Sequence, residues 1–407
     1  MADLPVDITP TDEQHRALRA LAALVEDGPE TLVMAGLAGT GKTTLMRLLA
    51  TMLRASGWEV LWCAPTGKAA ARLRDKVGEE VRTIHSLIYR SVRADEVGNL
   101  HFGDLRPICG PRTVVIADEA SMIGSSLGRD LRACIPKSSK LILVGDDGQL
   151  EPIDEPWYAD FASAHVRLTG VHRQALESAL LRKALDIRLG RVNQFPRESE
   201  GNYAWIRGTN RDAAQWMAER EQADATLLAW TNKDRERLNR LVRQELGLQG
   251  ALLNRGERVL VLTNSKVHRV MNGEVVRATG LRASDHHREG DYAERVFELS
   301  WEGKETGHPA LVHKDSFGAD RTALTALLGR QALRGSWLHV DYGYTLTVHK
   351  AQGSEWASVG IVVTDGAAYA LSKAPAARRG ARLRRWAYTA LTRASGEALI
   401  VDTVGGR

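Results

Sequence analysis

Short apolar runs alternate with helical patterns through the first third of the chain. The apolar runs cover residues 31–36, 58–64, 113–118 and 140–146, and amphipathic patterns begin at Lys42 and Gly67. Strands that are apolar over their whole length, with helices between them, are typical of a parallel sheet covered on both faces. The pattern therefore predicts an α/β domain for residues 1–168.

Polar residues interrupt this regularity between the second and third apolar runs. Residues 88–102 alternate polar and apolar positions around the turn-forming sequence ADEVGN. Alternation on both sides of such a turn predicts a β-hairpin. We expect this hairpin, at about residues 86–110, to be inserted into the first domain as an accessory element.

A second alternation of strands and helices begins after Thr169. It predicts a second α/β domain, with apolar runs at residues 226–230, 337–346, 358–363 and 397–401. Short strand patterns separated by Gly, Asn, Asp and His break its continuity and predict a small antiparallel barrel. We therefore expect the second domain at 169–262 and 338–407, with the barrel inserted at 263–337.

Composition supports several domains and a partner that carries phosphates. With 407 residues, 43% of them hydrophobic, the chain can bury more than one core. The net charge of +5 and the pI of about 9.1 leave a basic excess that favours contact with phosphates. Three widely spaced cysteines fit reduced thiols better than disulfides. The start of the chain lacks the pattern of a secretory signal, and no segment reaches the ~18 apolar residues of a membrane span. We therefore expect a protein without membrane contact, located in the cytoplasm of a bacterium or of a phage-infected host.

A phosphate-binding loop is the clearest chemical motif. The sequence GLAGTGKT at residues 36–43 directly follows an apolar run and opens a helical pattern, which is the context that a P-loop requires. Backbone N–H groups of its glycines can surround phosphates, Lys42 can reach the terminal phosphates, and the Thr43 hydroxyl can bind Mg²⁺. An ordinary glycine-rich turn is the alternative. The predicted nucleotide-binding residues of this segment are Gly36, Gly39, Thr40, Gly41, Lys42, Thr43 and Thr44.

Two later strands end in residues that suit the same chemistry. Asp118 and Glu119 follow the run at 113–117, at the sheet edge where ligands bind in such folds. We expect Asp118 to hold Mg²⁺ with Thr43, and Glu119 to orient or deprotonate the attacking water. The alternative is that one carboxylate only caps the next helix. Gln149 follows the run at 140–146 and could contact the γ-phosphate, although an ordinary polar loop also explains that stretch.

Nine short motifs in a fixed order carry a resemblance to a known family. They are GLAGTGKT, APTGKAA, TIHS, ADEAS, VGDDGQLEPI, VHRQ, AWTNKDRERLN, YTLTVHKAQGSEW and YTALTRA. Together they resemble the motifs of superfamily 1 helicases and are most similar to the Dda-like and RecD-like branch, superfamily 1B. The resemblance runs from about Thr9 to Val401. It implies two RecA-like P-loop cores, with the hairpin as a pin in the first and an SH3-like β-barrel inserted in the second.

The resemblance also implies roles for further residues around the nucleotide. Gln14 matches the glutamine that reads adenine, and Arg173 and Arg393 match two arginines that reach from the second core to the ATP. Arginine there stabilises the charge of the transition state and couples hydrolysis to domain closure. Glu355 matches a residue near the nucleotide sugar, where many Dda-like relatives carry Ser or Thr.

The resemblance implies a track for a single nucleic acid strand as well. Small hydroxyl and amide side chains with scattered bases suit phosphate contacts that do not depend on sequence. The track residues are Pro65, Thr66, Lys68, Thr83, His85, Ser86, Thr231, Asn232, Thr347, His349 and Lys350. His101 and Phe102, at the edge of the hairpin, are the candidates for separating the strands, with a purely stabilising hairpin as the alternative.

The resemblance implies an ATP- and Mg²⁺-dependent DNA helicase that moves 5′ to 3′ in replication, repair or recombination. We expect a monomer that binds single-stranded and forked DNA, with single-strand-binding or replication proteins as further partners. A nucleic-acid-stimulated ATPase that acts as a switch or loader without unwinding is the alternative. A nuclease subunit is a third reading, for which the chain leaves little room beyond the motor.

Overall fold

The computed structural model describes most of the chain outside residues 284–337. The described residues are 10–90, 92–94, 100–152, 155–171, 177–192, 194–248, 250, 253–262, 265, 267–283, 296–303, 310–313, 316–317, 338–366 and 376–404. None of the helices in these ranges is long and apolar enough to cross a membrane.

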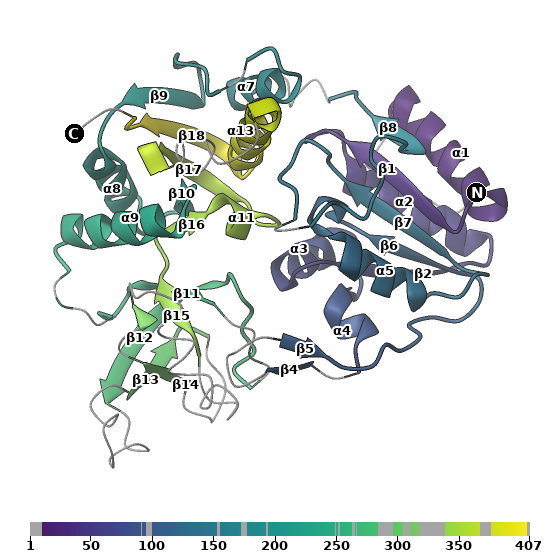
Figure 1. Ribbon diagram of the computed structural model, residues 1–407, viewed down its shortest axis with the longest axis horizontal. Helices are drawn as coiled ribbons and strands as arrows, with labels where there is room; N and C mark the ends of the chain where they lie inside the picture. The colour runs from purple at the N-terminus through teal and green to yellow at the C-terminus, as the bar shows by residue number, and fades with distance from the viewer. Residues whose placement is uncertain are drawn as a thin grey trace.

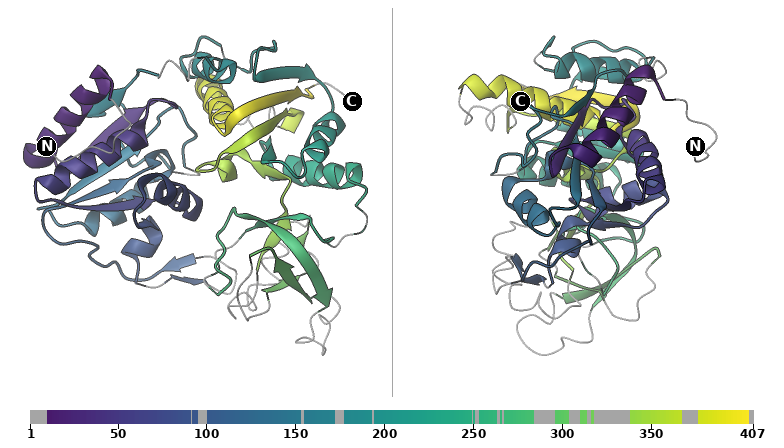
Figure 2. Two further views of the ribbon diagram at one scale, coloured as in Figure 1. Left: turned by 180° about the vertical axis from the view of Figure 1, so that it is seen from behind. Right: turned by 90° about the vertical axis from the view of Figure 1, so that its right-hand side faces the viewer.

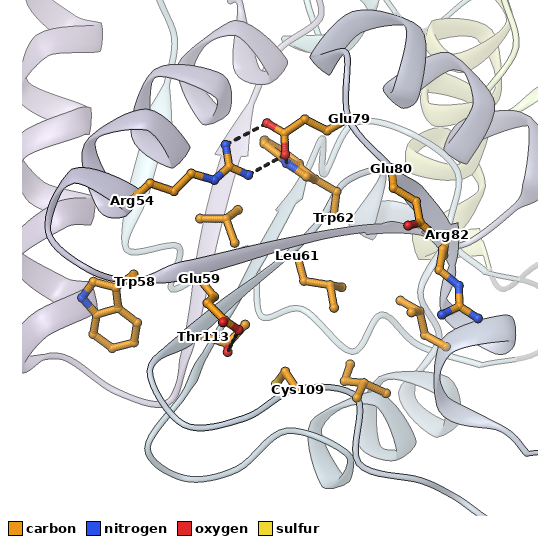
Figure 3. A pocket seen from close by; sticks show the side chains of 13 residues that line it. Arg54, Trp58, Glu59, Leu61, Trp62, Glu79, Glu80, Arg82, Cys109 and Thr113 are labelled. Atoms are coloured by element: carbon orange, nitrogen blue, oxygen red, sulfur yellow. Dashed lines mark hydrogen bonds and ion pairs between the residues drawn. The ribbon is translucent and has the colours of Figure 1, made fainter. Parts of the chain in front are cut away.

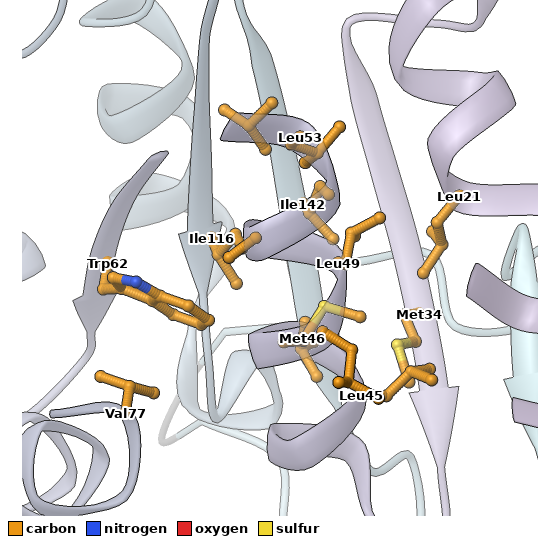
Figure 4. Close-up of a cluster of buried hydrophobic side chains, with 14 of the residues drawn as sticks. Leu21, Met34, Leu45, Met46, Leu49, Leu53, Trp62, Val77, Ile116 and Ile142 are labelled. Atoms are coloured by element: carbon orange, nitrogen blue, oxygen red, sulfur yellow. The ribbon is translucent and has the colours of Figure 1, made fainter. Parts of the chain in front are cut away.

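A six-stranded parallel sheet forms the first core (Figure 1). Its order is β3 (Val81–Thr83), β2 (Glu59–Ala64), β6 (Thr113–Ala117), β7 (Lys140–Gly145), β1 (Thr31–Gly36) and β8 (Val166–Leu168). Two buried clusters cover its faces. One joins the sheet to α1 (Asp12–Asp27), α2 (Lys42–Ala55) and α3 (Gly67–Val77), with Leu21, Leu49 and Trp62 among its members (Figure 4). The other joins the sheet to α4 (Ile84–Ile88) and α5 (Ser125–Ala133).

Alternation within the strands explains why both faces are covered. Met34 of β1 belongs to the first cluster, whereas its neighbours Val33 and Ala35 belong to the second. Successive strand residues point to opposite faces, so an unbroken apolar run requires helices on both sides. The predicted α/β fold with parallel sheets is therefore confirmed for this core.

An antiparallel strand pair extends from the first core after α4. Strand β4 (Val92–Ala94) pairs with β5 (Leu100–Phe102), with Arg93 opposite His101. The pairing continues at the base, where Arg90 N donates to Asp104 O at 3.0 Å and Arg106 N donates to Ile88 O at 2.9 Å. The hairpin is thus anchored to the end of α4.

A five-stranded parallel sheet forms the second core. Its order is β16 (Thr345–Thr347), β10 (Ala225–Ala229), β17 (Trp356–Val363), β18 (Ala394–Asp402) and β9 (Tyr203–Arg207). Helices α7 (Ala179–Arg188), α11 (Val348–Ala351) and α13 (Ala376–Leu391) pack on one face, and α8 (Asn210–Glu219) and α9 (Asn232–Glu245) pack on the other. The predicted α/β pattern is confirmed here as well.

An antiparallel sheet of five strands is attached to the second core. Its order is β14 (Ala310–His313), β13 (Val296–Trp301), β12 (Val275–Ala283), β11 (Arg258–Val261) and β15 (Val340–Tyr342). Strands β11 and β15 lie just outside residues 263–337, so this sheet uses residues on both sides of that range. Leu338 N donates to Leu311 O at 2.8 Å, which links the start of β15 to β14.

Two buried ion pairs join this small sheet to α9. Arg243 Nε lies 2.7 Å from Glu257 Oε1, and Arg235 Nη2 lies 2.7 Å from Asp341 Oδ2. The small sheet and the hairpin lie at the same end of the molecule, below the two cores in both Figure 1 and Figure 2.

Candidate functional site

A cavity of about 770 Å³ lies between the two cores. Residues of the first core line one side, and residues of α7, of the segment after α11 and of the end of α13 and the segment after it line the other. Of the predicted site residues, the lining includes Gly39, Gly41, Lys42, Thr43, Thr44, Asp118, Glu119, Gln149, Glu355 and Arg393. The structure thus brings together residues that are more than 300 positions apart in the chain.

The loop between β1 and α2 forms one wall of the cavity. Gly39 and Gly41 have φ angles of 78° and 77°, a left-handed conformation that glycine adopts without steric cost. Lys42 Nζ donates to Gly36 O at 2.8 Å and to Leu37 O at 3.0 Å, and Thr40 Oγ1 donates to Leu37 O at 2.9 Å. Helix α2 begins at Lys42 without a side-chain cap, so its first-turn N–H groups are available to phosphates.

The carboxylates at the end of β6 face this loop. Asp118 Oδ2 lies 3.4 Å from Thr43 Oγ1, and Asp118 Oδ1 accepts the backbone N–H of Glu119 at 2.8 Å. Burial, and then the neighbouring Glu119 carboxylate, raises the pKa of Asp118 to about 6. A hydroxyl beside a carboxylate offers two oxygen ligands to a hard cation such as Mg²⁺, whose charge would offset that of the two carboxylates.

Glu119 has a backbone conformation that supports a functional role. Its φ of 54° is left-handed, which costs a residue other than glycine about 1–3 kcal/mol. It precedes the 3₁₀ helix η1 (Ala120–Met122) but makes no side-chain cap hydrogen bond there. Within the described part of the chain, Glu119 therefore does not cap this helix, and its side chain lines the cavity.

Gln149 contributes a buried polar atom to the same cavity. Its backbone N donates to Asp146 O at 3.1 Å, while Oε1 has no hydrogen-bond partner among the described residues. A buried acceptor without a partner costs about 1–3 kcal/mol. The loop after β7 therefore presents a group that a water or a nucleotide would satisfy.

Gln14 contacts the P-loop from α1. Its side-chain Nε2 donates to Thr40 O at 3.1 Å, and its Oε1 accepts from Thr11 N at 3.0 Å within a capping box. The side chain of Gln14, which the resemblance predicts to contact adenine, is thus buried against the P-loop.

Arg393 enters the cavity from the second core. Its Nε donates to Thr389 O at 3.1 Å and its Nη1 donates to Ser354 O at 3.2 Å, so backbone carbonyls fix the guanidinium. Burial lowers the pKa of Arg393, and the Glu119 carboxylate across the cavity opposes that shift. Arg173, the second predicted arginine, lies outside the described residues.

Sequence reasoning missed a basic row on α3. Glu355 of the second core forms an ion pair with Arg72 of the first, and Arg72 and Lys76 both line the cavity. Lys68, Arg72 and Lys76 are four residues apart and therefore share a helix face. That spacing was the available signal. The ion pair of Arg72 with Glu355 left no signal in the local sequence, because its two residues belong to different cores.

The threonines of the predicted strand track share one structural role. Each accepts a backbone N–H in the first turn of the helix that follows: Thr66 from Ala69, Thr83 from Ser86, Thr231 from Asp234 and Thr347 from Lys350. Thr66 follows β2 and Thr83 ends its neighbour β3 in the first core; Thr231 follows β10 and Thr347 ends its neighbour β16 in the second. The predicted track residues therefore include two neighbouring pairs of capped helix starts, one pair on each core.

The remaining track residues lie beside these helix starts. Lys68 Nζ lies 5.4 Å from the centroid of the Trp356 ring, which joins α3 to the second core. Burial lowers the pKa of Lys68 to about 8, against the opposing charge of Glu274. Burial also lowers the pKa values of His85 and His349. Pro65 and Asn232 adjoin Thr66 and Thr231 in the sequence, and Ser86 and Lys350 donate the backbone N–H groups that Thr83 and Thr347 accept. The side chains of His101 and Phe102 lie outside the described part of the hairpin.

A second cavity, of about 610 Å³, lies along β2 (Figure 3). Arg54 and Glu79 pair at one side of it, with Nη1 2.8 Å from Oε1. None of the predicted site residues is among those that line it.

Comparison with known proteins identifies families at both ends of the chain. The family described as AAA domain matches residues 9–210, and the family described as UvrD-like helicase C-terminal domain matches residues 342–401. These ranges contain the two walls of the larger cavity.

Two relatives and one solved structure extend the match. The ATP-dependent RecD2 DNA helicase of Deinococcus radiodurans is 30% identical over 398 residues, which is 94% of this chain and 48% of that protein. The ATP-dependent DNA helicase Dda of phage T4 is 26% identical over 255 residues, 58% of this chain and 57% of that protein. The chain thus spans about half the length of these curated relatives. The Pif1 helicase structure from Candida albicans is 18% identical, with a TM-score of 0.50, and covers 97% of this chain and 94% of that one, which shows a shared fold.

The ordered motifs, the two parallel sheets around a shared cavity and these relatives agree. The chain belongs to the superfamily 1B helicases, the group of Dda and RecD.

Proposed function

We propose that the chain is an ATP-dependent DNA helicase that moves 5′ to 3′ along single-stranded DNA and unwinds duplex. One observation carries the proposal: a single cavity has Lys42, Asp118 and Glu119 on its first wall and Arg393 on its second. Hydrolysis in such a cavity requires both cores, so it can be coupled to their relative motion. The names of the curated relatives, which are DNA helicases, support the same activity.

The residues of the first core would bind ATP and prepare water. N–H groups from Gly39 to Thr44 would bind phosphates at the start of α2, and Lys42 would exchange its loop carbonyls for the terminal phosphates. Thr43 and Asp118 would hold Mg²⁺, which when bound neutralises phosphate charge. Glu119 would orient or deprotonate the attacking water, with Gln149 as a second polar contact.

The second core would supply the charge that completes the transition state. The Arg393 guanidinium is fixed by two carbonyls and faces the Glu119 side, so closure would bring it to the γ-phosphate without reorganisation. We assign the same kind of role to Arg173. We propose that Glu355 reaches the nucleotide sugar once its ion pair with Arg72 opens.

Sequence-independent contacts would hold the DNA strand. The capped helix starts at Thr66 and Thr83 would bind phosphates on the first core, and those at Thr231 and Thr347 on the second. Since each pair belongs to one core, a change in the distance between the cores would move the pairs along the strand. Lys68, His85, Ser86, His349 and Lys350 would add polar contacts.

The accessory elements would act on the duplex. We propose that the hairpin of β4 and β5 is the pin, with His101 and Phe102 at its edge, and that an SH3-like barrel at 263–337 supports it. Their position at one end of the molecule favours joint action on the DNA fork (Figure 2).

Residues 1–168 would form the first motor core, and residues 169–262 together with 338–407 would form the second. The proposed 5′-to-3′ direction of movement rests on the resemblance to superfamily 1B. We place the protein in the cytoplasm as a monomer acting in replication, repair or recombination, beside single-strand-binding or replication proteins.

Unwinding of partial duplexes tests this function. Two labelled substrates, with a 5′ or a 3′ single-stranded tail, are incubated with the protein, ATP and Mg²⁺, alongside strand-stimulated ATP hydrolysis. We expect unwinding of the 5′-tailed substrate alone. Unwinding of the 3′-tailed substrate alone would reverse the polarity, and hydrolysis without unwinding of either substrate would favour a switch or loader.

A further inference from the structure

The Tyr388 hydroxyl connects the two cores behind Ala38, a residue that lines the cavity between them. Tyr388 belongs to α13 of the second core and is fully buried. Its hydroxyl accepts the backbone N–H of Ala38 in the P-loop at 2.9 Å and donates to Asp146 Oδ2, at the end of β7, at 2.5 Å. One oxygen atom of the second core thus contacts two segments of the first.

The direction of these hydrogen bonds follows from their chemistry. The Ala38 N–H can only donate, so the Tyr388 oxygen must accept from it, and the phenol proton must go to Asp146. The Asp146 carboxylate also accepts from Gly148 N at 2.9 Å through its other oxygen. Burial and the Asp146 charge raise the pKa of Tyr388 far above its usual range, so the phenol stays protonated and can donate.

Two further residues of the second core, Thr389 and Gln352, bind the loop that follows β7. Leu150 N donates to Thr389 Oγ1 at 3.0 Å, and Leu150 O accepts from Gln352 Nε2 at 3.3 Å. Asp146 and Leu150 are therefore both held, on either side of Gln149. Gly148, in the same loop, packs so closely against the second core that no side chain fits there. A Cβ would lie 3.0 Å from Cε1 of Tyr388 and closer still to the Arg188 side chain.

The same helix end also fixes the catalytic arginine. Arg393 Nε donates to Thr389 O at 3.1 Å, and Thr389 adjoins Tyr388. The P-loop, the loop of Gln149 and Arg393 therefore meet at one end of α13. We infer that Tyr388 is a positioning residue, whose hydroxyl sets the approach of Arg393 to a nucleotide held by the P-loop. This inference rests on the proposed ATP hydrolysis.

A phenylalanine substitution isolates the hydroxyl. Tyr388→Phe keeps the ring and removes both hydrogen bonds, one of them to a charged group, so we expect kcat of strand-stimulated hydrolysis to fall about tenfold. The Kd for a fluorescent ATP analogue, measured without DNA, should stay within about threefold, because Ala38, Tyr388 and Asp146 act on alignment rather than on phosphate binding.

Tyr203→Phe is the matched control. Tyr203 of β9 is equally buried, and its hydroxyl donates to Pro196 O at 2.7 Å inside the second core, away from the cavity. This variant should keep kcat within about twofold of the natural chain. A Tyr388→Phe kcat within twofold of the natural one, or an equal fall in the control, would overturn the inference.

Asp146→Asn tests the hydrogen bond from its other end. An asparagine keeps one acceptor oxygen, so it cannot serve both Gly148 and Tyr388, and kcat should fall to a similar extent. The double variant should lose less than the product of the two single losses, since the hydrogen bond between Tyr388 and Asp146 is absent from both single variants. If the two single losses in kcat multiply in the double variant, or if Asp146→Asn hydrolyses ATP at the natural rate, the inferred role of Tyr388 is contradicted. A natural chain without ATPase would instead refute the proposed function.

Discussion

Thr43 Oγ1 lies 3.4 Å from Asp118 Oδ2, and the two atoms come from different elements, the start of α2 and the end of β6. Parallel strands with helices between them bring such positions to one edge of the sheet. Asp118 is buried beside Glu119, and both effects raise its pKa, so a bound cation would stabilise its ionised form.

Asp118→Asn should therefore abolish most hydrolysis while the fold persists. The amide keeps the shape but removes the charge that holds Mg²⁺, so we expect strand-stimulated kcat to fall about a hundredfold or more. The Mg²⁺ concentration that gives half-maximal rate should rise. Asp75→Asn, an exposed substitution on α3, is the control and should leave both values unchanged. An Asp118→Asn chain with the natural Mg²⁺ dependence would remove Asp118 from the proposed site.

Arg393→Ala should separate ATP binding from hydrolysis. Arg393 reaches the cavity from the second core, so its loss should reduce kcat about a thousandfold and change the Kd for a fluorescent ATP analogue by less than about threefold. Arg211→Ala removes an exposed arginine of the same core, paired with Glu245, and should behave like the natural chain. Loss of nucleotide binding in Arg393→Ala, with an unchanged melting temperature, would contradict a purely catalytic role.

Local sequence was enough for the P-loop and the parallel sheets, because each depends on a contiguous pattern. The capped start after Thr66 was also readable, since Thr66 directly precedes the helical pattern at Gly67. The helices after Thr83 and Thr347 have five and four residues and are too short to leave a periodic pattern. The contacts of Glu355 with Arg72 and of Tyr388 with Ala38 were not readable either. Their partners lie hundreds of residues away, and only the packing of one core against the other brings them together. The same limit applies to β11 and β15, whose apolar runs do not reveal which sheet they join.

Affinity for single-stranded DNA should fall as the pH rises from 7 to 9. Burial lowers the pKa of Lys68 to about 8, so the ammonium is charged below that value and neutral above it. A DNA phosphate binds only the charged form, and we expect the Kd to rise about fivefold to tenfold over this interval. Fluorescence anisotropy with a labelled oligonucleotide at constant ionic strength measures it. Lys68→Met should bind more weakly at pH 7 and lose most of the pH dependence. An equal pH dependence in that variant would exclude Lys68 from the strand track.

Leu49→Ala should destabilise the first core without touching the cavity. Leu49 of α2 is fully buried between the helix and the sheet (Figure 4). Removing its side chain leaves a void, and the free energy of unfolding should fall by about 2–5 kcal/mol. Met52→Ala changes an exposed residue of the same helix and should cost less than about 1 kcal/mol. Urea unfolding followed by circular dichroism compares them, and equal costs would mean that α2 packs differently.

Shortening the hairpin should uncouple ATP hydrolysis from strand separation. Residues 95–99 connect β4 to β5 and lie outside the described residues, while Ala94 and Leu100 form a pair across the strands. A two-residue Asn-Gly turn can close the same pair, because such turns match the twist of paired strands. The shortened hairpin would reach less far towards the DNA fork, whereas the cavity between the cores would be unchanged. We therefore expect strand-stimulated hydrolysis within about twofold of the natural rate and unwinding reduced at least about tenfold.

Replacing residues 95–99 by five glycines and serines is the matched control, because it keeps the length of the connection and changes only its side chains. If the hairpin acts as a steric wedge, this variant should unwind the 5′-tailed duplex nearly as well as the natural chain. If His101 or Phe102 stacks on the separating bases, alanine at either position should reduce unwinding even though the hairpin keeps its length. Natural rates of unwinding in the shortened chain would show that the pin is elsewhere in the molecule.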